Sequence, residues 1–278
     1  MMELTKIEMK PEARTTDMFP KVSIVMPSFN QAEFLERSIL SVLNQSYPNV
    51  ELIVMDGGST DGSVEIIKKY QDRISYWESG PDRGQAHAIN KGLAIATGEW
   101  VGWQNSDDIY TEDAIEKLIE CAHKNPNAGL VIGDMSMIDA QDKKIRNIRY
   151  IRPSYKSILA EGMVLSNQSS LWKRSLHSIV GYLDENLHFN FDYEWFLRLL
   201  HNTDAAHTPI VLGSLRVHEQ TKTFLNQPEF DRENTLILEG RGTPVFIRNL
   251  YKLRRYSIHL LNGQFRHLYE QMQYWLRK

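Results

Sequence analysis

The chain has 278 residues, of which 42% are hydrophobic and 24% are charged, and this composition is that of an ordinary globular protein. Its formal net charge of -3 argues against a nucleic-acid-binding protein that depends on bulk positive charge. The single cysteine, Cys121, excludes an internal disulfide and a multi-cysteine zinc site, and no run of about 20 apolar residues is present to cross a membrane.

The first part of the chain alternates short apolar runs with helical patterns. Residues 1–20 mix charged and scattered apolar residues and lack the apolar run of a signal peptide, so we expect a loose extension there. Apolar runs at residues 22–26 and 50–55 predict two strands, and the helical spacing of apolar residues between them predicts a helix. Strand and helix in this rhythm indicate βαβ units and a largely parallel sheet.

Asp56 follows the second predicted strand and precedes a turn rich in glycine and serine. Glycines let the backbone approach a ligand closely, so Asp56 is a candidate binding residue. A turn-forming aspartate is the alternative that the sequence leaves open. The turn after the first strand, residues 27–30, lacks the G-x-G-x-x-G pattern of a dinucleotide site, and a P-loop is missing as well.

A glycine-rich loop at residues 78–85 carries one fixed cation, Arg83, between a short predicted strand at residues 74–77 and a predicted helix at residues 86–96. A guanidinium group close to the free backbone N–H groups of a helix start suits a diphosphate. A solvated turn is the competing interpretation.

The next predicted strand, residues 99–104, ends abruptly in polar residues that include Asp107 and Asp108. Two adjacent carboxylates at the end of a buried strand repel one another unless a cation, or a phosphate-bearing ligand with its cation, lies between them. Open α/β sheets bind their ligands at this edge. The alternative is that the two aspartates only start the following helix.

The second half of the chain is less regular. Strands are expected at residues 130–134, 145–151, 167–172 and 210–218. An amphipathic helix is expected at residues 191–200, and Asp192 in its first turn either favours the helix dipole or acts as a base. His218 ends the last of these strands, where a structural role is the alternative to a functional one.

After Pro228 the composition shifts. An amphipathic helix is expected from Thr243 to about Gly263, and residues 265–276 repeat its apolar pattern. The other faces bear basic residues, namely Arg248, Lys252, Arg254, Arg255, Arg266, Arg277 and Lys278. Such helices fit a surface lying against an anionic bilayer, or a helical hairpin that packs on the domain with a solvated basic rim.

Three stretches together resemble family 2 glycosyltransferases of the GT-A fold. They are VSIVMPSFNQAEFLERSILSVLNQSYPNVELIVMDGGSTDGS, GPDRGQAHAINKGLAIATGEWVGWQNSDD and FDYEWFLRL, and the resemblance covers about residues 21–220. It implies an α/β fold, a GT-A Rossmann-like single domain with a mostly parallel mixed central sheet. We expect this domain at residues 21–228, after the extension at residues 1–20 and before a C-terminal amphipathic helical segment at residues 229–278.

The resemblance also assigns roles along the sheet edge. Pro27, Ser28 and Asn30 correspond to the rim of the sugar-nucleotide pocket, and Asp56 to the carboxylate that accepts a hydrogen bond from the nucleotide base. Arg83 is the cation that we expect near the diphosphate.

The family's D-x-D position holds Asn105, Ser106 and Asp107. Asn105 replaces the first aspartate, so it can hydrogen-bond a ribose but adds no charge. We therefore expect Asp107 to be the main ligand of Mg²⁺ or Mn²⁺ and Asp108 to be the second.

Asp192 matches the general base of the family's Glu-Asp pair, in which Phe191 replaces the glutamate, and His218 resembles a late ligand to the diphosphate or metal.

The implied activity is metal-dependent, inverting transfer of a sugar from a UDP- or dTDP-sugar to a hydroxyl acceptor, in bacterial surface polysaccharide or lipid-linked glycan synthesis. A divalent cation and an arginine neutralise the departing diphosphate, and a base removes the acceptor proton. We expect a cytoplasmic protein at the inner face of the cell membrane, with a glycan acceptor and no nucleic-acid partner. A catalytically impaired sugar-nucleotide-binding module and a sugar nucleotidyltransferase are the alternatives.

Overall fold

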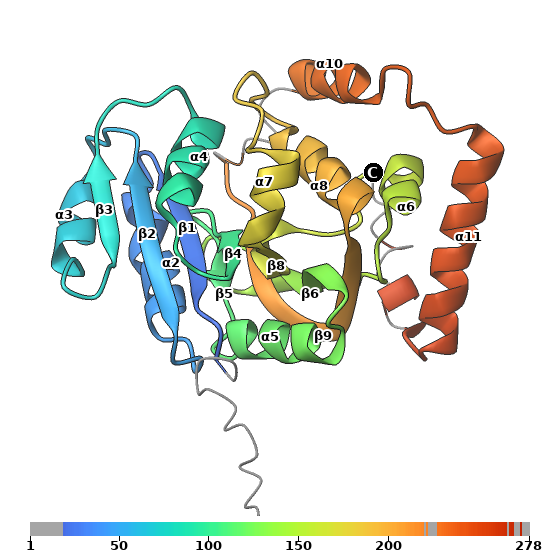
Figure 1. The fold of residues 1–278 in the computed structure, drawn as a ribbon, viewed down its shortest axis with the longest axis horizontal. Helices are drawn as coiled ribbons and strands as arrows, with labels where there is room; N and C mark the ends of the chain where they lie inside the picture. Colours follow the sequence, from blue (N-terminus) through green and yellow to red (C-terminus); the bar gives the residue numbers. More distant parts are fainter. Residues whose placement is uncertain (1–18, 220, 222–226, 266, 270–272, 274–278) are drawn as a thin grey trace, which may run out of the picture.

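The computed structural model describes residues 19–219, 221, 227–265, 267–269 and 273. Nearly all of the predicted extension at residues 1–20 therefore lies outside the described residues, as does much of the predicted helical repeat at residues 265–276. In the described chain, helices cover both faces of one central sheet (Figure 1).

The N-terminal half of this sheet is parallel. Its strands, in spatial order, are β3 (Tyr76–Ser79), β2 (Val50–Asp56), β1 (Val22–Ser28) and β4 (Trp100–Trp103). β1 and β2 run in register until Ser28 lies opposite Asp56, so both strands end at the same edge. The polar turns that follow the predicted strands are thereby brought together, as expected for an open α/β sheet.

The second half of the sheet is mixed. β8 (Ser170–Lys173) runs antiparallel to β4 and to β6 (Ala128–Ile138), whereas β9 (Asp204–Arg216) runs parallel to β6. Two short antiparallel strands complete it, β5 (Ile109–Tyr110) on β9 and β7 (Lys144–Ile148) on β6. The antiparallel β8 lies between β4, with its polar turn, and the long β6–β9 pair.

The core lies on both faces of the sheet because side chains alternate along each strand. Ile24 and Met26 of β1 pack toward α2 (Ala32–Leu43), in a cluster that also contains α5 (Ala114–Lys124). Val25 faces the other side and packs with α4 (Gln85–Ile95) and α8 (Phe191–Asn202). Burial of each such side chain stabilises the fold by about 1.5–3 kcal/mol. The shorter helices are α3 (Ser63–Lys69), α6 (Tyr155–Glu161) and α7 (His177–Val180), with 3-10 turns at Asn167–Ser169 and Arg174–Leu176.

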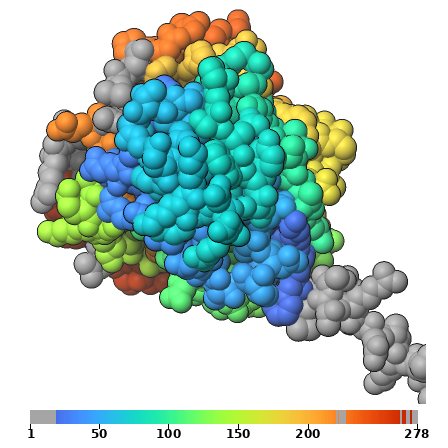
Figure 2. All heavy atoms as spheres, turned by 90° about the vertical axis from the view of Figure 1, so that its left-hand side faces the viewer, coloured from blue at the N-terminus to red at the C-terminus, as the bar shows by residue number. Residues whose placement is uncertain are grey.

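Two helices follow the sheet. α10 (Gln227–Leu238) begins the segment at residues 229–278 that was expected to be helical, although no separate helix was predicted there, and its Ile237 joins the core cluster that contains α4 and α8. Figure 2 shows the face formed by the N-terminal half, with α10 in orange along the top. α11 (Val245–Leu261) was predicted, and it contacts α6 (Figure 1). None of the described helices is long and apolar enough to cross a membrane.

The predicted elements differ from the observed ones in two places that matter for the site. Residues 167–169 form a 3-10 turn rather than the start of a strand, and only Ser170–Lys173 pairs in the sheet. Asp107 and Asp108 do not start a helix, because β5 lies between them and α5. The mixed α/β fold itself is confirmed. The division at residue 228 stays a prediction, although α10 packs into the same core.

Candidate active site

A cavity of about 840 Å³ opens at the carboxyl ends of β1, β2 and β4. This volume lies in the range of small-molecule binding sites. The cavity is lined by seven of the residues predicted from sequence, which are Pro27, Ser28, Asn105, Ser106, Asp107, Asp108 and Asp192. Four others, Asn30, Asp56, Arg83 and His218, are not part of its lining. Segments up to 165 residues apart in the sequence therefore meet at one edge of the sheet.

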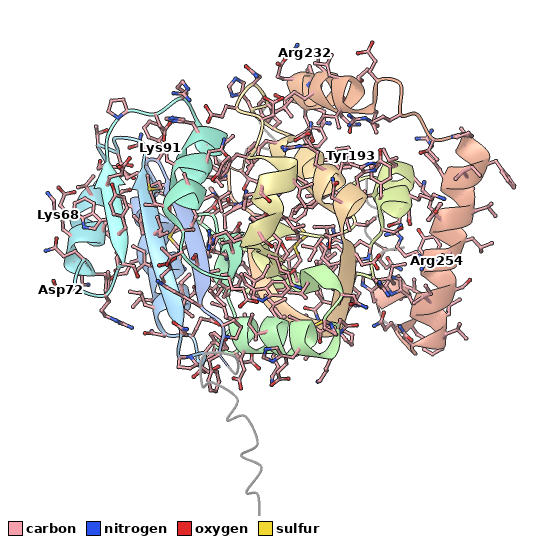
Figure 3. All side chains as sticks on the ribbon, viewed as in Figure 1. Lys68, Asp72, Lys91, Tyr193, Arg232 and Arg254 are labelled. Carbon is pink, nitrogen blue, oxygen red and sulfur yellow. The ribbon has the colours of Figure 1, made fainter. Side chains whose placement is uncertain are left out.

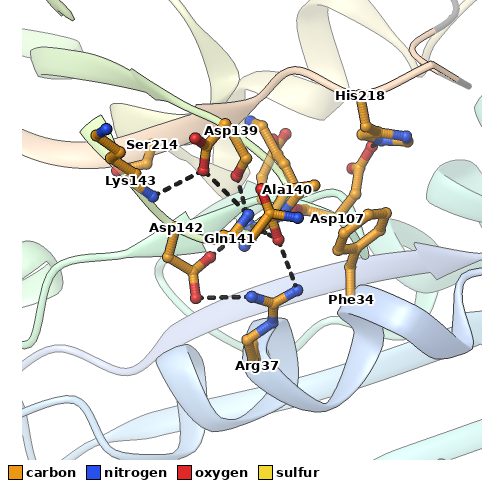
Figure 4. Close-up of polar contacts among 12 residues, drawn as sticks. Phe34, Arg37, Asp107, Asp139, Ala140, Gln141, Asp142, Lys143, Ser214 and His218 are labelled. Carbon is orange, nitrogen blue, oxygen red and sulfur yellow. Dashed lines mark hydrogen bonds and ion pairs between the residues drawn. The ribbon is translucent and has the colours of Figure 1, made fainter. Parts of the chain in front are cut away.

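Asp107, in the turn after β4, meets His218, which follows the end of β9. His218 Nε2 lies 3.0 Å from Asp107 Oδ2, and the two side chains are 7% and 22% exposed. The imidazole ring also packs on Phe34 of α2, with ring centroids 4.6 Å apart (Figure 4). Asp107, predicted as a metal ligand, and His218, predicted as a ligand to the diphosphate or metal, therefore lie side by side.

Asp108 has a different environment from its neighbour. Its side chain is fully buried, and its carboxylate accepts hydrogen bonds from Arg216 N (2.8 Å), Gln168 Nε2 (2.7 Å) and Asn105 Nδ2 (2.9 Å). Burial and the adjacent Asp107 carboxylate raise the pKa of Asp108 to about 8. Both carboxylate oxygens are engaged by protein donors, which is the geometry of a residue that holds the turn in place.

Arg216 at the end of β9 is the buried cation of the site. Its guanidinium Nε donates to the backbone oxygen of Asp107 at 2.7 Å, and Nη1 pairs with Asp142 and donates to the backbone oxygen of Asp139 at 3.0 Å. Arg37 of α2 pairs with the same Asp142 carboxylate at 2.7 Å (Figure 4). Arg216 therefore ties the Asp107 turn to the turn between β6 and β7.

The residues after β1 and β2 form one interlocked turn. Asp56 is buried and accepts from the backbone N–H groups of Gly58 and Ser59 and from the hydroxyls of Ser59 and Ser79. Asn30 has a φ of 51° and accepts from Thr60 N at 2.9 Å. Both side chains have the contacts of turn-forming residues, whereas Gly57, next to Asp56, lines the cavity.

Arg83 lies outside the cavity lining. Its side chain is 69% exposed and pairs with Glu185 across the chain. The solvated interpretation of this loop fits that contact better than a diphosphate ligand does. Gln85, two residues later, does line the cavity, and its Nε2 donates to Asn105 Oδ1 at 2.9 Å.

Asp192 lines the cavity from the first turn of α8. Burial raises the pKa of its carboxyl group to about 6, and the charge of Glu233 adds to the rise, while the backbone N–H of Tyr193, which donates to Oδ1 at 2.7 Å, opposes it. A carboxylate with a pKa near 6 can accept a proton at neutral pH, as a general base must.

Several residues of the site were not predicted from the sequence. Gln168 and Arg216 hold Asp108, and Glu233 on α10 acts on Asp192. The only signal for Arg216 was its position two residues before His218 in a strand, which places both side chains on one face. Glu233 lies in the C-terminal segment that was expected to be helical, but nothing in the sequence linked it to Asp192.

The sequence model described as Glycosyl transferase family 2 matches residues 23–178, more than half of the chain and the whole parallel half of the sheet. The chain belongs to glycosyl transferase family 2. An uncharacterized glycosyltransferase of Rickettsia typhi is 30% identical over 228 residues, which cover 76% of this chain and 69% of that protein. The putative teichuronic acid biosynthesis glycosyltransferase TuaG of Bacillus subtilis is 35% identical over 133 residues, 45% of this chain and 53% of TuaG.

Solved structures agree with the fold of this glycosyltransferase. The S. aureus TarS 1-349 structure in complex with UDP-GlcNAc superposes with a TM-score of 0.64 at 16% identity, over 78% of this chain and 65% of that one. The mannosyltransferase PcManGT from Pyrobaculum calidifontis, in complex with GDP-Man and Mn²⁺, superposes with a TM-score of 0.63 at 16% identity, over 92% of this chain and 83% of that one. The chain thus spans slightly less than two thirds of the TarS fragment, and these likenesses show the GT-A fold.

Proposed function

We propose that this glycosyltransferase moves a sugar from a UDP- or dTDP-sugar to a hydroxyl acceptor with inversion at the transferred carbon. The observation that supports this most is the presence of Asp107, paired with His218, and Asp192 around one cavity. We propose that Asp107 and His218 lie beside the leaving diphosphate and that Asp192 lies beside the attacking hydroxyl.

On the donor side, Pro27, Ser28 and Gly57 form the cavity wall where the nucleotide would lie. Asp56 contributes by fixing the turn that contains Gly57, because its carboxylate already accepts four hydrogen bonds from the protein. Asn105 lines the same cavity, and we propose that it hydrogen-bonds the ribose. In this proposal Asp56 does not need to touch the nucleotide base, and Arg83 does not need to touch the diphosphate.

Asp107 and His218 are the residues that fit a divalent cation, since a carboxylate oxygen and an imidazole nitrogen face each other at 3.0 Å. In the part of the chain that the structure describes, no group of three or more His, Cys, Asp or Glu side chains could hold a metal ion. The remaining ligands would come from the diphosphate and water, and the imidazole favours Mn²⁺ over Mg²⁺. Such an ion supplies positive charge to the departing diphosphate.

On the acceptor side, Asp192 accepts the proton of the attacking hydroxyl group. Because this carboxylate acts as a base and does not itself attack the sugar, the acceptor oxygen displaces the diphosphate directly, and the transferred carbon is inverted. The acceptor would lie against the part of the cavity formed by Tyr150 and Phe189. We propose a glycan or lipid-linked glycan acceptor, in line with the naming of TuaG as a teichuronic acid biosynthesis glycosyltransferase.

We also propose that α11 lies against the anionic inner face of the cell membrane. Its apolar side chains Val245, Phe246, Leu250, Leu253 and Leu260 are 46–67% exposed. The helix carries four basic residues and no acidic one. Exposed apolar side chains with adjacent basic charge suit an anionic bilayer surface.

The test of the transferase proposal is a panel of sugar nucleotides with Mn²⁺, measured by thermal shift and by release of nucleoside diphosphate in the presence of acceptor extracts. A true donor raises the melting temperature by mass action and is turned over. Asp192→Asn is expected to keep the thermal shift and to lose turnover. Binding without turnover by the wild-type protein would instead support a sugar-nucleotide-binding module, and full turnover by Asp192→Asn would remove Asp192 from the mechanism.

A further inference from the structure

Glu233 lies on the inner side of α10 and is 1% exposed, whereas its neighbour Arg232 lies on the outer side of the helix (Figure 3). Its carboxylate accepts hydrogen bonds from three consecutive backbone N–H groups, those of His188 (2.7 Å), Phe189 (2.9 Å) and Asn190 (2.8 Å). A buried carboxylate is costly unless donors of this kind satisfy it. α10 is thereby anchored on residues 188–190.

A second contact joins the same two segments. Asn190 Nδ2 donates to the backbone oxygen of Phe230 at 2.8 Å. Asn190 is the residue directly before α8, and Asp192 is the second residue of that helix. His188 and Phe189 line the cavity beside Asp192. The position of the Asp192 carboxylate therefore depends on how this loop is held.

We propose that Glu233 is a positioning residue for Asp192: from α10 it fixes residues 188–190, and with them the first turn of α8 that points Asp192 into the cavity. The effect of Glu233 on catalysis rests on the proposed function, in which Asp192 is the base. The anchoring of residues 188–190 by Glu233 does not depend on that function. α10 is then part of the active-site architecture and more than a connection to α11.

Charge supports the same assignment. The Glu233 carboxylate adds to burial in raising the pKa of Asp192 to about 6. Tyr150, from the segment after β7, also interacts electrostatically with Asp192, and Arg149, His188 and Arg255 line the same cavity. Removal of the Glu233 charge should lower the pKa of Asp192, so the rising limb of the pH–rate profile should move to lower pH.

The experiment compares Glu233→Gln and Glu233→Ala with Glu229→Gln, which changes a partly exposed carboxylate that pairs with Arg232, one turn earlier on the same helix. Glutamine keeps the shape of the side chain but replaces one carboxylate oxygen with an NH₂ group, which cannot accept a hydrogen bond from the backbone N–H groups of residues 188–190. Hydrogen–deuterium exchange at residues 188–192 is measured in the full-length chain, followed by binding of UDP, GDP and dTDP with Mn²⁺, kcat and its pH profile.

For Glu233→Gln we expect exchange at residues 188–192 to quicken, nucleotide binding to stay within twofold, kcat to fall about tenfold and the rising limb to shift to lower pH. For Glu233→Ala we expect a fall in kcat of about 100-fold, because small misplacements of a catalytic group cost this much. Glu229→Gln should match the wild type.

Unchanged exchange in both Glu233 variants would overturn the inference, and so would faster exchange with unchanged kcat. If the wild-type protein turned over no sugar nucleotide, the proposed function would fail while the exchange measurement still decided whether Glu233 holds the loop.

Discussion

At the scale of single residues, the site separates side chains that we propose touch substrate from side chains that hold the turns in place. Asp107 and Asp192 line the cavity, where Asp107 pairs with His218 and Asp192 accepts from Tyr193 N, whereas both carboxylate oxygens of Asp108 are engaged by Arg216, Gln168 and Asn105. Two adjacent aspartates thus have different tasks. The difference arises from burial and hydrogen bonding, neither of which the Asp-Asp pair reveals in the sequence.

Asp192 leads to a prediction on stability. Its carboxyl group has a pKa of about 6 in the folded protein against an ordinary value of 3.8, so the protonated form stabilises the fold and this stabilisation is lost as the pH rises through about 6. Asp192→Asn stays neutral and can still accept from Tyr193 N. At pH 8 the variant should be more stable than the wild type, by at most about 3 kcal/mol from a shift of about two pKa units.

The measurement is urea unfolding of both proteins at several pH values. The difference in the free energy of unfolding should shrink as the pH falls through 6 and vanish below about 4, where both side chains are neutral. A difference that does not change with pH would show that Asp192 is not held in the environment described.

Arg83 and Arg216 show which functional roles local sequence patterns can and cannot predict. Arg83 lies in a glycine-rich loop before a helix, a local pattern that suits phosphate, yet the fold pairs it with Glu185 in solvent. Arg216 lies in an ordinary strand, but it is fully buried, with its guanidinium 4.9 Å from the ring centroid of Phe34 and bonded to the Asp107 backbone. Its role depends on contacts with residues 74 to 182 positions away, which no local pattern records.

At the scale of elements, the two C-terminal helices differ in what they contact. α10 buries Glu233 and Ile237 against the domain, whereas α11 leaves an apolar row exposed. Contact with the domain is limited for α11, and Arg255 pairs with Glu161 of α6 at 2.7 Å. The contact of these helices with the domain agrees with one interpretation of this region, and the exposed apolar row of α11 is the surface on which the membrane contact is proposed.

The membrane proposal predicts the behaviour of a double variant. Phe246→Glu with Leu253→Glu places charge in the exposed apolar row, where the wild-type side chains are 67% and 63% exposed. Sedimentation with phosphatidylglycerol-containing vesicles should fall at least about tenfold, because apolar burial in the interface is lost. Ile179→Glu is the matched control, since Ile179 is 66% exposed on α7. Equal vesicle binding by the double variant and the wild type would contradict the proposal.

At the scale of the whole molecule, the parallel half of the sheet was predictable and the mixed half was not. Apolar runs and helical spacing in the first 104 residues are local signals, and the observed β1, β2, α4 and β4 follow them closely. The order of β8, β6 and β9 is set by pairing between distant segments. The convergence of Asp107, His218 and Asp192 depends on that order, so the resemblance to a family could anticipate it where periodicity could not.

The central feature of the proposed site is a divalent ion held by Asp107 and His218 beside the donor diphosphate. Calorimetric titration of UDP, GDP and dTDP into the full-length protein, with and without Mn²⁺, tests this most directly. We predict that Mn²⁺ tightens the binding of at least one nucleotide about tenfold or more, equivalent to about 1.4 kcal/mol, in the wild type and has no such effect in a folded Asp107→Ala variant. Equal tightening in both proteins would contradict it.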